Sequence, residues 1–342
     1  MNIIFGKAPI GYDRELIKEF RKIKPDSKIK LIHNDFLLGV PTNFWKPGKK
    51  IIHINNPLQL PVAVLWKHLF QAKLIYSLHG VPKIRTIKLQ KGFFWTFLYT
   101  TIYLSWKTFH DQIDHIISCS DYIKWELDYI WKKKSTRIYY GIRKKKFYPA
   151  KNFILAKKKI SSKEKIILFV GRFTPYKDPL TFIEALGILK DKMDFEAIMI
   201  NGFKKAPLLK EIKTKIQMEN LTDKIKVIKG RLPHKILKEY YQGSDVMVLP
   251  SICEAFGTVS SECIACGTPV IVSNLGGPKD VVNGGGIPFK IGNARDLFKK
   301  LEHFLLNEEI QSKLKSEAIK RALFLGDWDR AALEVLKIYE EI

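Results

Sequence analysis

The sequence lacks acidic residues over a long stretch, since none occurs between Phe36 and His110. Residues 1–155 contain 28 basic and 10 acidic residues, a net charge of +18 out of the +25 of the whole chain. A surplus of this size attracts polyanions, either nucleic acid or an anionic membrane surface. Composition alone does not decide between the two.

The chain also lacks features that assign proteins to several other classes. It has no apolar run long enough to span a membrane and no secretory signal at its start, so we expect a cytoplasmic protein. Its four cysteines lack metal-binding spacing, because Cys263-x-x-Cys266 has neither a second pair nor nearby histidines. We expect reduced, buried thiols. No helix-turn-helix, RRM-like or OB pattern is present, which disfavours specific nucleic-acid binding.

What is present is a regular alternation of short apolar strands and helices. Such alternation predicts mostly parallel sheets covered by helices, and 342 residues bury two cores more readily than one. The Lys- and Ser-rich stretch 148–164 is typical of a linker. We therefore expect α/β domains at 1–155 and 156–327, followed by an amphipathic helix at 328–342.

The most informative stretch runs from Val246 to Val272. It predicts a buried strand, a short loop, a helix from about Phe256 and a second buried strand, because two apolar β-branched runs bracket a segment closed by Gly267-Thr268-Pro269. In open α/β sheets, the carboxyl end of a strand facing a helix N-terminus is where backbone N–H groups hold a ligand phosphate. Gly257, which has no side chain, would let a ligand come close to the backbone there.

Two glutamates frame this turn, Glu254 and Glu262. Eight helical residues would span ~12 Å, which exceeds the roughly 5–9.5 Å between paired glycosidase carboxylates. The spacing therefore suggests a clamp on a long ligand such as a nucleotide sugar. The alternative is a helix-start glutamate and an ordinary solvent-facing one.

A second motif follows the expected strand Lys165–Val170. Gly171-Arg172 and then Lys177 place two cations after one strand, where they can neutralise a departing diphosphate. The alternative is two solvated loop cations.

Together these motifs resemble the donor site of the retaining GT-B glycosyltransferases of glycosyltransferase family four, the glycosyl transferases group 1. The resemblance implies two doubly wound Rossmann-like domains facing across a cleft, with acceptor on the first, donor on the second and the last helix crossing back onto the first. It implies hexosyl transfer from a UDP- or GDP-sugar with retention at the anomeric carbon. No metal and no cofactor beyond the co-substrate are expected.

The resemblance also implies roles for individual residues. Arg172 and Lys177 would contact the donor diphosphate, Glu262 the ribose, and Glu254 would serve transfer. His79, which follows the expected strand Lys73–Ser77, would face the transferred sugar. The remaining donor-binding positions are the first glycine loop, the loop that holds the base and the amides after Glu254: Gly11, Gly230, Arg231, Ala255, Phe256, Gly257 and Thr258.

The aromatic segment 91–107 has apolar residues all round, so it is buried, membrane-facing or both. Aromatic residues with basic flanks are typical of an interfacial anchor, and the alternative is a helix packed on the sheet. The anchor or acceptor positions are Lys83, Arg85, Lys88, Lys91, Trp95 and Lys107.

These features favour a glycolipid or polyprenyl-linked acceptor in surface polysaccharide or lipopolysaccharide synthesis, with peripheral attachment to the inner face of the cytoplasmic membrane. A soluble transferase acting on small sugars or sugar phosphates and a basic nucleic-acid-binding protein are the alternatives. We interpret the cations at 143–146 as a solvated surface. Asp327-Trp328-Asp329 is expected to cap a helix rather than bind a metal.

Overall fold

A computed structural model describes residues 1–6, 12–32, 44, 47–80, 93–203 and 205–342. The chain forms two compact units. The first comprises Met1–Gly141 and Gly326–Ile342, and the second comprises Ile142–Leu325.

The first unit contains a six-stranded parallel sheet in the order β2-β1-β3-β4-β5-β6. Because β1 lies between β2 and β3, the direction of winding reverses between β1 and β3, and open sheets of this kind bind ligands at the carboxyl edge of such a point. The strands are β1 (Asn2–Gly6), β2 (Lys28–Ile32), β3 (Lys50–Ile54), β4 (Lys73–Leu78), β5 (His115–Ser118) and β6 (Thr136–Arg137).

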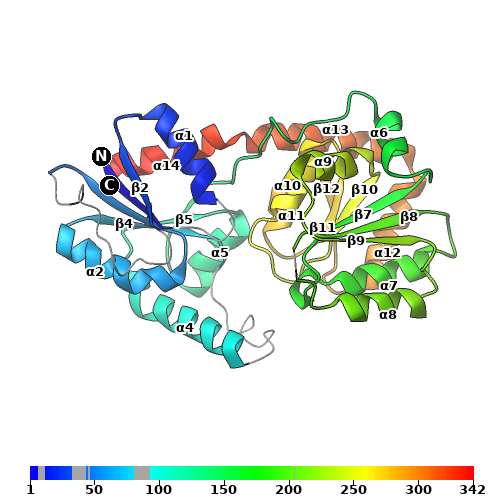
Figure 1. Cartoon of the computed structure of the whole chain (residues 1–342), viewed down its shortest axis with the longest axis horizontal. Helices are drawn as coiled ribbons and strands as arrows, with labels where there is room; N and C mark the ends of the chain where they lie inside the picture. The colour runs from blue at the N-terminus through cyan, green and yellow to red at the C-terminus, as the bar shows by residue number, and fades with distance from the viewer. Residues whose placement is uncertain (7–11, 33–43, 45–46, 81–92, 204) are drawn as a thin grey trace. The chain divides into compact units, whose positions relative to one another are not determined.

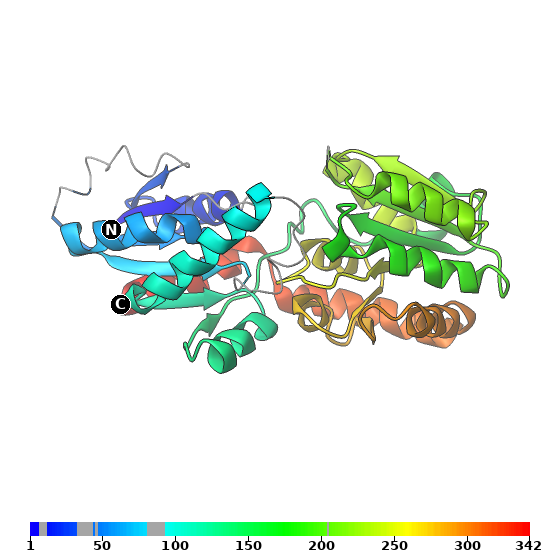
Figure 2. The same ribbon diagram turned by 90° about the horizontal axis from the view of Figure 1, so that it is seen from below.

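Helices cover both faces of this sheet. The α-helices described are α1 (Tyr12–Ile23), α2 (Leu60–Phe70), α4 (Phe93–Phe109), α5 (Asp121–Ile130) and α14 (Trp328–Glu341). Helix α14 packs against α1 on one face, while α2 and α4 pack together on the other (Figure 1). Figure 2 shows α2 and α4 side by side from below.

The second unit repeats this plan with the strand order β12-β11-β10-β7-β8-β9, again all parallel. Here the winding reverses between β7 and β10. The strands are β7 (Ile166–Gly171), β8 (Glu196–Asn201), β9 (Ile225–Lys229), β10 (Val246–Leu249), β11 (Val270–Ser273) and β12 (Gly286–Phe289). Two doubly wound α/β units confirm the predicted fold class.

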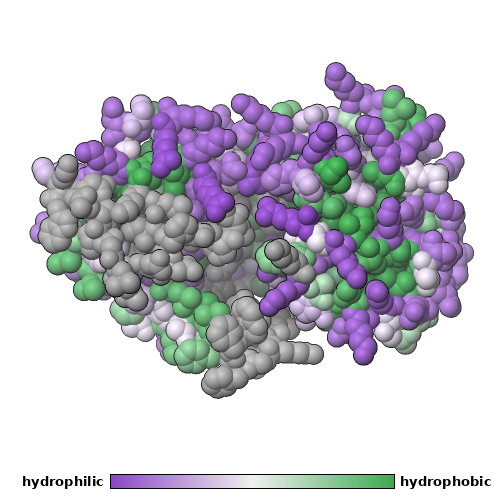
Figure 3. All heavy atoms as spheres, in the orientation of Figure 1, coloured by the Kyte–Doolittle hydropathy of each residue, from purple (hydrophilic) through white to green (hydrophobic). Residues whose placement is uncertain are grey.

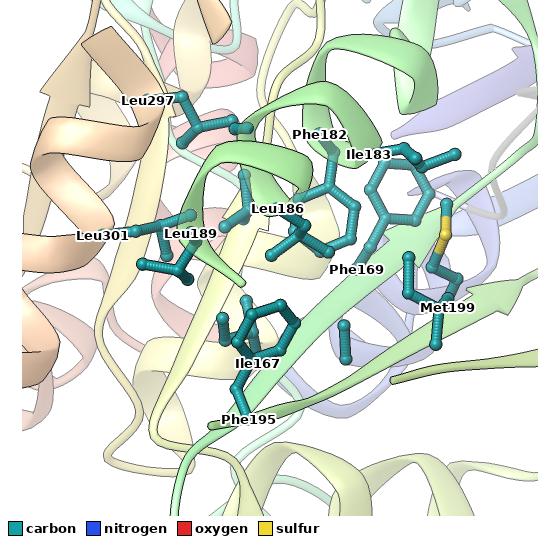
Figure 4. Packing of buried hydrophobic residues seen from close by; sticks show 14 of the residues in the cluster. Ile167, Phe169, Phe182, Ile183, Leu186, Leu189, Phe195, Met199, Leu297 and Leu301 are labelled. Atoms are coloured by element: carbon teal, nitrogen blue, oxygen red, sulfur yellow. The ribbon is translucent and has the colours of Figure 1, made fainter. Parts of the chain in front are cut away.

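One layer of helices over this second sheet encloses a large apolar core. Leu186 and Leu189 of α7, with Leu297 and Leu301 of α12, pack in one core with apolar side chains of β7 and β8 (Figure 4). The helices of this unit are α6 (Phe153–Ile160), α7 (Pro179–Leu189), α8 (Leu209–Met218), α9 (His234–Gly243), α10 (Thr258–Ala265), α11 (Gly277–Val281), α12 (Ala294–Leu306) and α13 (Glu308–Leu325).

The chain leaves the first unit after Gly141 and returns after Leu325, whereas the sequence placed these crossings at 155–156 and 327–328. The stretch 148–164 is not an extended linker, because it contains α6, which is capped by Asn152 and packs against α9. The Lys-rich composition reflects the exposed side of a short helix.

Apolar side chains reach the surface on the α2 and α4 face of the first unit. Leu65, Leu69, Phe97 and Leu104 are each more than half exposed, and Figure 3 shows hydrophobic surface in this region. Within the described residues, no helix combines the length and apolarity needed to cross a membrane.

Candidate functional site

The two loops at the switch point of the second sheet are tied together. The loop after β7 carries Arg172 and Lys177, and the loop after β10 carries Glu254. The strands are neighbours, and the Ile252 N–H donates to the Tyr176 carbonyl oxygen at 2.8 Å. The expected strand, loop and helix at 246–265 are confirmed, although α10 begins at Thr258, two residues later than predicted.

Lys177 and Glu254 meet directly as an ion pair between the Lys177 Nζ and a Glu254 carboxylate oxygen. The Ser251 hydroxyl also donates to that oxygen at 3.5 Å. Lys177 is only 9 % exposed, and its methylene chain lies beside Gly171. Two residues predicted from separate motifs therefore form one unit, in which each charge neutralises the other.

Arg172 has a different environment from Lys177. Its side chain is exposed, and its guanidinium lies 5.0 Å from the ring centre of Tyr176 and 5.3 Å from that of Phe203. Flat aromatic faces hold a guanidinium while leaving its N–H groups available. In the part of the chain that the structure describes, no carboxylate lies within ion-pairing distance of Arg172, so its charge is available to an anion.

Glycines hold the Glu254 loop in place. Gly257 caps α10 with φ of 82°, a left-handed conformation that favours glycine. The Gly277 N–H donates to the Glu254 carbonyl oxygen at 3.0 Å, and a Cβ on Gly277 would lie 1.8 Å from the Ala255 carbonyl oxygen. Sequence reasoning missed this support, although Gly276-Gly277-Pro278 after a buried strand was a readable signal.

The same loop contains the residues after Glu254 whose backbone amides are predicted to contact the donor. Phe256 is buried, whereas Ala255 and Thr258 are partly exposed. The Ser260 hydroxyl donates to the Gly257 carbonyl oxygen at 2.6 Å, which fixes the first turn of α10. The helix N-terminus is thus presented beside Glu254, where its dipole favours negative charge.

Glu262 is buried inside the second unit, so it is not an ordinary solvent-facing glutamate. Its carboxylate accepts a hydrogen bond from the Tyr241 hydroxyl at 3.4 Å and lies 3.5 Å from the Arg143 Nη1. Burial raises the pKa of Glu262 to about 7, opposed by the charges of Arg143, Arg231 and Lys146 and by the Tyr241 hydrogen bond. Because α10 starts at Thr258, Glu254 lies outside the helix and the ~12 Å helical spacing does not apply.

The loop predicted to hold a base begins at Gly230, whose φ is 89°. Arg231 follows it and lies close enough to Glu262 for its charge to lower the pKa of that carboxyl. The structure thus brings together the predicted base loop and the predicted ribose ligand. Gly230 and Arg231 lie in the connection from β9 to α9, whereas Glu262 lies within α10.

In the first unit, His79 sits at the carboxyl end of β4. Its Nδ1 is hydrogen-bonded to the Tyr140 hydroxyl, and its Nε2 is buried with no partner among the described residues. Burial lowers the pKa of His79 to about 3, so the imidazole is neutral at pH 7. The rings of Tyr12, Tyr140 and Trp328 gather beside it.

Further unsatisfied polar atoms lie at the switch point of the first sheet. Asn55 donates to the Gly6 carbonyl oxygen at 2.8 Å, while its Oδ1 is buried and has no partner among the residues that the structure describes. Both amide atoms of the buried Gln59 also lack partners within the described ranges. Such groups cost about 1–3 kcal/mol each when left unpaired, and they are neutral groups of the kind that pairs with hydroxyls.

Several predicted positions lie outside the described residues: Gly11, Lys83, Arg85, Lys88 and Lys91. Trp95 belongs to α4, but its side chain is outside the description too. Lys107 is exposed near the end of α4. Asp327 caps α14 by accepting from the Trp328 N–H at 2.8 Å, which confirms the predicted cap.

Comparison with known proteins identifies the family to which this chain belongs. The family model described as glycosyl transferases group 1 matches residues 150–321, half of the chain, including both loops of the site. This chain belongs to the glycosyl transferases group 1 family. An uncharacterized glycosyltransferase of Methanocaldococcus jannaschii is 30% identical over 311 residues, covering 88% of this chain and 80% of that relative.

Solved structures show that this family member has the GT-B fold. Sucrose-phosphate synthase from Thermosynechococcus elongatus superposes with a TM-score of 0.83 at 21% identity, covering 100% of this chain and 98% of that one. Anabaena HepE in complex with UDP-glucose superposes with a TM-score of 0.77 at 16% identity over the full length of both chains. These likenesses establish the fold, and family membership establishes the chain as a glycosyltransferase.

Proposed function

We propose that this glycosyltransferase transfers a hexosyl unit, with retention of anomeric configuration, from a UDP- or GDP-sugar to a membrane-associated glycolipid or polyprenyl-linked glycan. The reaction would serve surface polysaccharide or lipopolysaccharide synthesis. The observation that carries the donor proposal is the Lys177–Glu254 ion pair at the switch point of the second sheet, beside the N-terminus of α10. Arg172 lies in the same loop as Lys177, with its guanidinium over the Tyr176 ring. HepE, which shares the fold, was solved with UDP-glucose bound.

In this proposal the donor diphosphate competes with Glu254 for Lys177. The bond between the anomeric carbon and the phosphate oxygen breaks, and negative charge grows on the departing diphosphate. Lys177, Arg172 and the α10 amides stabilise that charge without a metal. The carboxylate of Glu254, released from Lys177, then accepts hydrogen bonds from sugar hydroxyls.

The acceptor hydroxyl attacks the same face of the sugar, and its proton passes to the leaving phosphate oxygen. We assign no covalent nucleophile. His79 is neutral at pH 7, so its role is a hydrogen bond to a hydroxyl of the transferred sugar rather than a charge.

Membrane attachment is proposed from the surface of the first unit. Phe97 and Leu104 on α4 and Leu65 and Leu69 on α2 are exposed, as is Lys107 near the end of α4. Exposed apolar side chains in a basic stretch of sequence suit the headgroup region of an anionic leaflet. The protein would then lie at the inner face of the cytoplasmic membrane. A soluble transferase acting on small sugars or sugar phosphates remains the second candidate, favoured by the fold shared with sucrose-phosphate synthase.

A panel of UDP- and GDP-sugars tests the proposal. We expect one donor to be hydrolysed slowly alone and faster when detergent-solubilised lipid-linked glycans are added. Acceleration only by water-soluble sugars or sugar phosphates would favour the second candidate. Hydrolysis of none of the donors would overturn the proposed UDP- or GDP-sugar donor, and sequence-selective retention of duplex DNA would favour a nucleic-acid-binding role.

A further inference from the structure

The basic run 143–146 is not uniformly a solvated surface. The amides of Lys146 and Phe147 both donate to the Arg143 carbonyl oxygen, at 2.8 and 2.9 Å, closing a turn. Phe147 is buried against the Tyr241 ring, with ring centres 5.9 Å apart. This anchored turn directs Arg143 toward Glu262, while Lys145 and Lys146 stay exposed.

Glu262 lies in a buried site where a carboxylate remains ionised only if neighbouring groups stabilise its charge. Its side chain is 9 % exposed. The groups around it are the Tyr241 hydroxyl, the Arg143 guanidinium, the more distant charges of Arg231 and Lys146, and the buried thiols of Cys263 and Cys266 on its own helix. Arg143 is the cation in ion-pairing distance. A buried carboxylate deprived of its cation binds a proton instead of remaining charged.

We propose that Arg143 is a positioning residue that keeps Glu262 ionised to accept hydrogen bonds from the donor ribose, so that Arg143 sets how nucleotide affinity depends on pH. The inference rests on the proposed donor site. An ionised carboxylate accepts from both ribose hydroxyls, whereas a protonated carboxyl carries a hydrogen of its own and loses acceptor capacity.

The sign of the effect follows from the direction of the shift. Burial raises the pKa of Glu262 to about 7, so the ionised form is depleted as pH falls through 7. Nucleotide affinity should fall with it, approaching tenfold per pH unit well below the midpoint. Removing the Arg143 charge raises the midpoint of the Glu262 titration, the pH at which half of this carboxyl is ionised. Arg143→Gln should therefore weaken nucleotide binding by about tenfold at pH 6.5 and hardly at all near pH 9.

The test compares Arg143→Gln with Arg143→Lys, which keeps the charge, and with Lys145→Gln, which removes an equal charge from an exposed position of the same turn. UDP and GDP affinities of the intact protein are measured by calorimetry from pH 6 to 9. The titration of the Glu262 carboxyl is followed separately by carbon-13 NMR, with its resonance assigned through Glu262→Gln.

We expect the Glu262 midpoint and the affinity profile to move to higher pH together in Arg143→Gln. Arg143→Lys should restore most of both, and Lys145→Gln should leave both near the wild-type values. An unmoved Glu262 midpoint, or a loss of affinity that is equal at every pH, would overturn the inference while leaving the donor site intact. Failure of the wild type to bind either nucleotide overturns the donor site, and this inference with it.

Discussion

The two units share a winding pattern but place opposite chemistry at the carboxyl edges of their sheets. In the second unit the candidate residues are charged: Lys177 pairs with Glu254, Arg143 pairs with Glu262, and Arg172 lies over the Tyr176 ring. In the first unit they are neutral: the uncharged His79, and the buried amides of Asn55 and Gln59, which have atoms with no partner in the described part of the chain. The difference teaches that one topology can present a site for a diphosphate or a site for hydroxyls, according to the side chains at the switch point.

The largest expected effect comes from the cations of the second unit. Removing one charged partner of a desolvated anion typically costs about 2–4 kcal/mol, so Lys177→Met and Arg172→Ala should each lower turnover on the order of 10²-fold. Lys192→Met, at an exposed position, is the control. Turnover within twofold of wild type in both site variants would remove these residues from the mechanism.

The same comparison predicts that no metal shares the diphosphate charge. Turnover measured in EDTA should match turnover in buffer. Activity abolished by the chelator and restored by Mg²⁺ or Mn²⁺ would contradict the assignment of that charge to Arg172 and Lys177.

Substitution of Glu254 and of Glu262 should have different effects on nucleotide binding and transfer, because the two residues lie in different surroundings within the second unit. Glu262→Ala should weaken free UDP or GDP binding on the order of 10²-fold, as expected for loss of two charge-assisted hydrogen bonds to a ribose. Glu254→Ala should leave nucleotide affinity nearly intact and reduce transfer. Calorimetry and turnover separate the two, and an equal loss of affinity in both variants would refute the division.

The glycine support beneath the charged site predicts a loss of stability. Gly277→Ala places a methyl group against the Ala255 carbonyl, so overpacking should cost about 1–3 kcal/mol and lower Tm. Gly202→Ala is the matched control, because a Cβ there meets no atom of the described residues within 4 Å. Equal Tm values for the two variants would mean that the loop relaxes freely.

The smallest expected effect concerns the surface of the first unit. The protein should pellet with anionic vesicles but not neutral ones, and salt should release it partly, because cations contribute roughly 1 kcal/mol each near an anionic leaflet. Charge reversal at three of Lys83, Arg85, Lys88, Lys91 and Lys107 should abolish binding while donor hydrolysis survives. Phe97→Ser with Leu104→Ser should remove the salt-resistant part. A protein that ignores anionic vesicles at low salt favours a soluble acceptor.

Sequence reasoning placed residues correctly in the fold where they follow a strand directly. Arg172, Lys177, Glu254 and His79 could be placed because each comes within a few residues of a predictable buried strand. The pairing of Arg143 with Glu262 could not be read, because it depends on how a turn and a distant helix pack. The linker predicted at 148–164 was wrong, because the Lys-rich composition of this stretch gave no sign of the short helix α6.

The central claim is that the charged site of the second unit binds the nucleotide diphosphate and the neutral site of the first does not. The most direct test measures UDP and GDP affinity by calorimetry in EDTA for wild type, Lys177→Met and His79→Gln. The claim predicts that one nucleotide binds the wild type and that Lys177→Met loses affinity for it on the order of tenfold or more. The affinity of His79→Gln should stay within about twofold of wild type, because His79 is proposed to form a neutral hydrogen bond to the sugar, which the free nucleotide lacks. Unchanged affinity in Lys177→Met, or an equal loss in both variants, would contradict it.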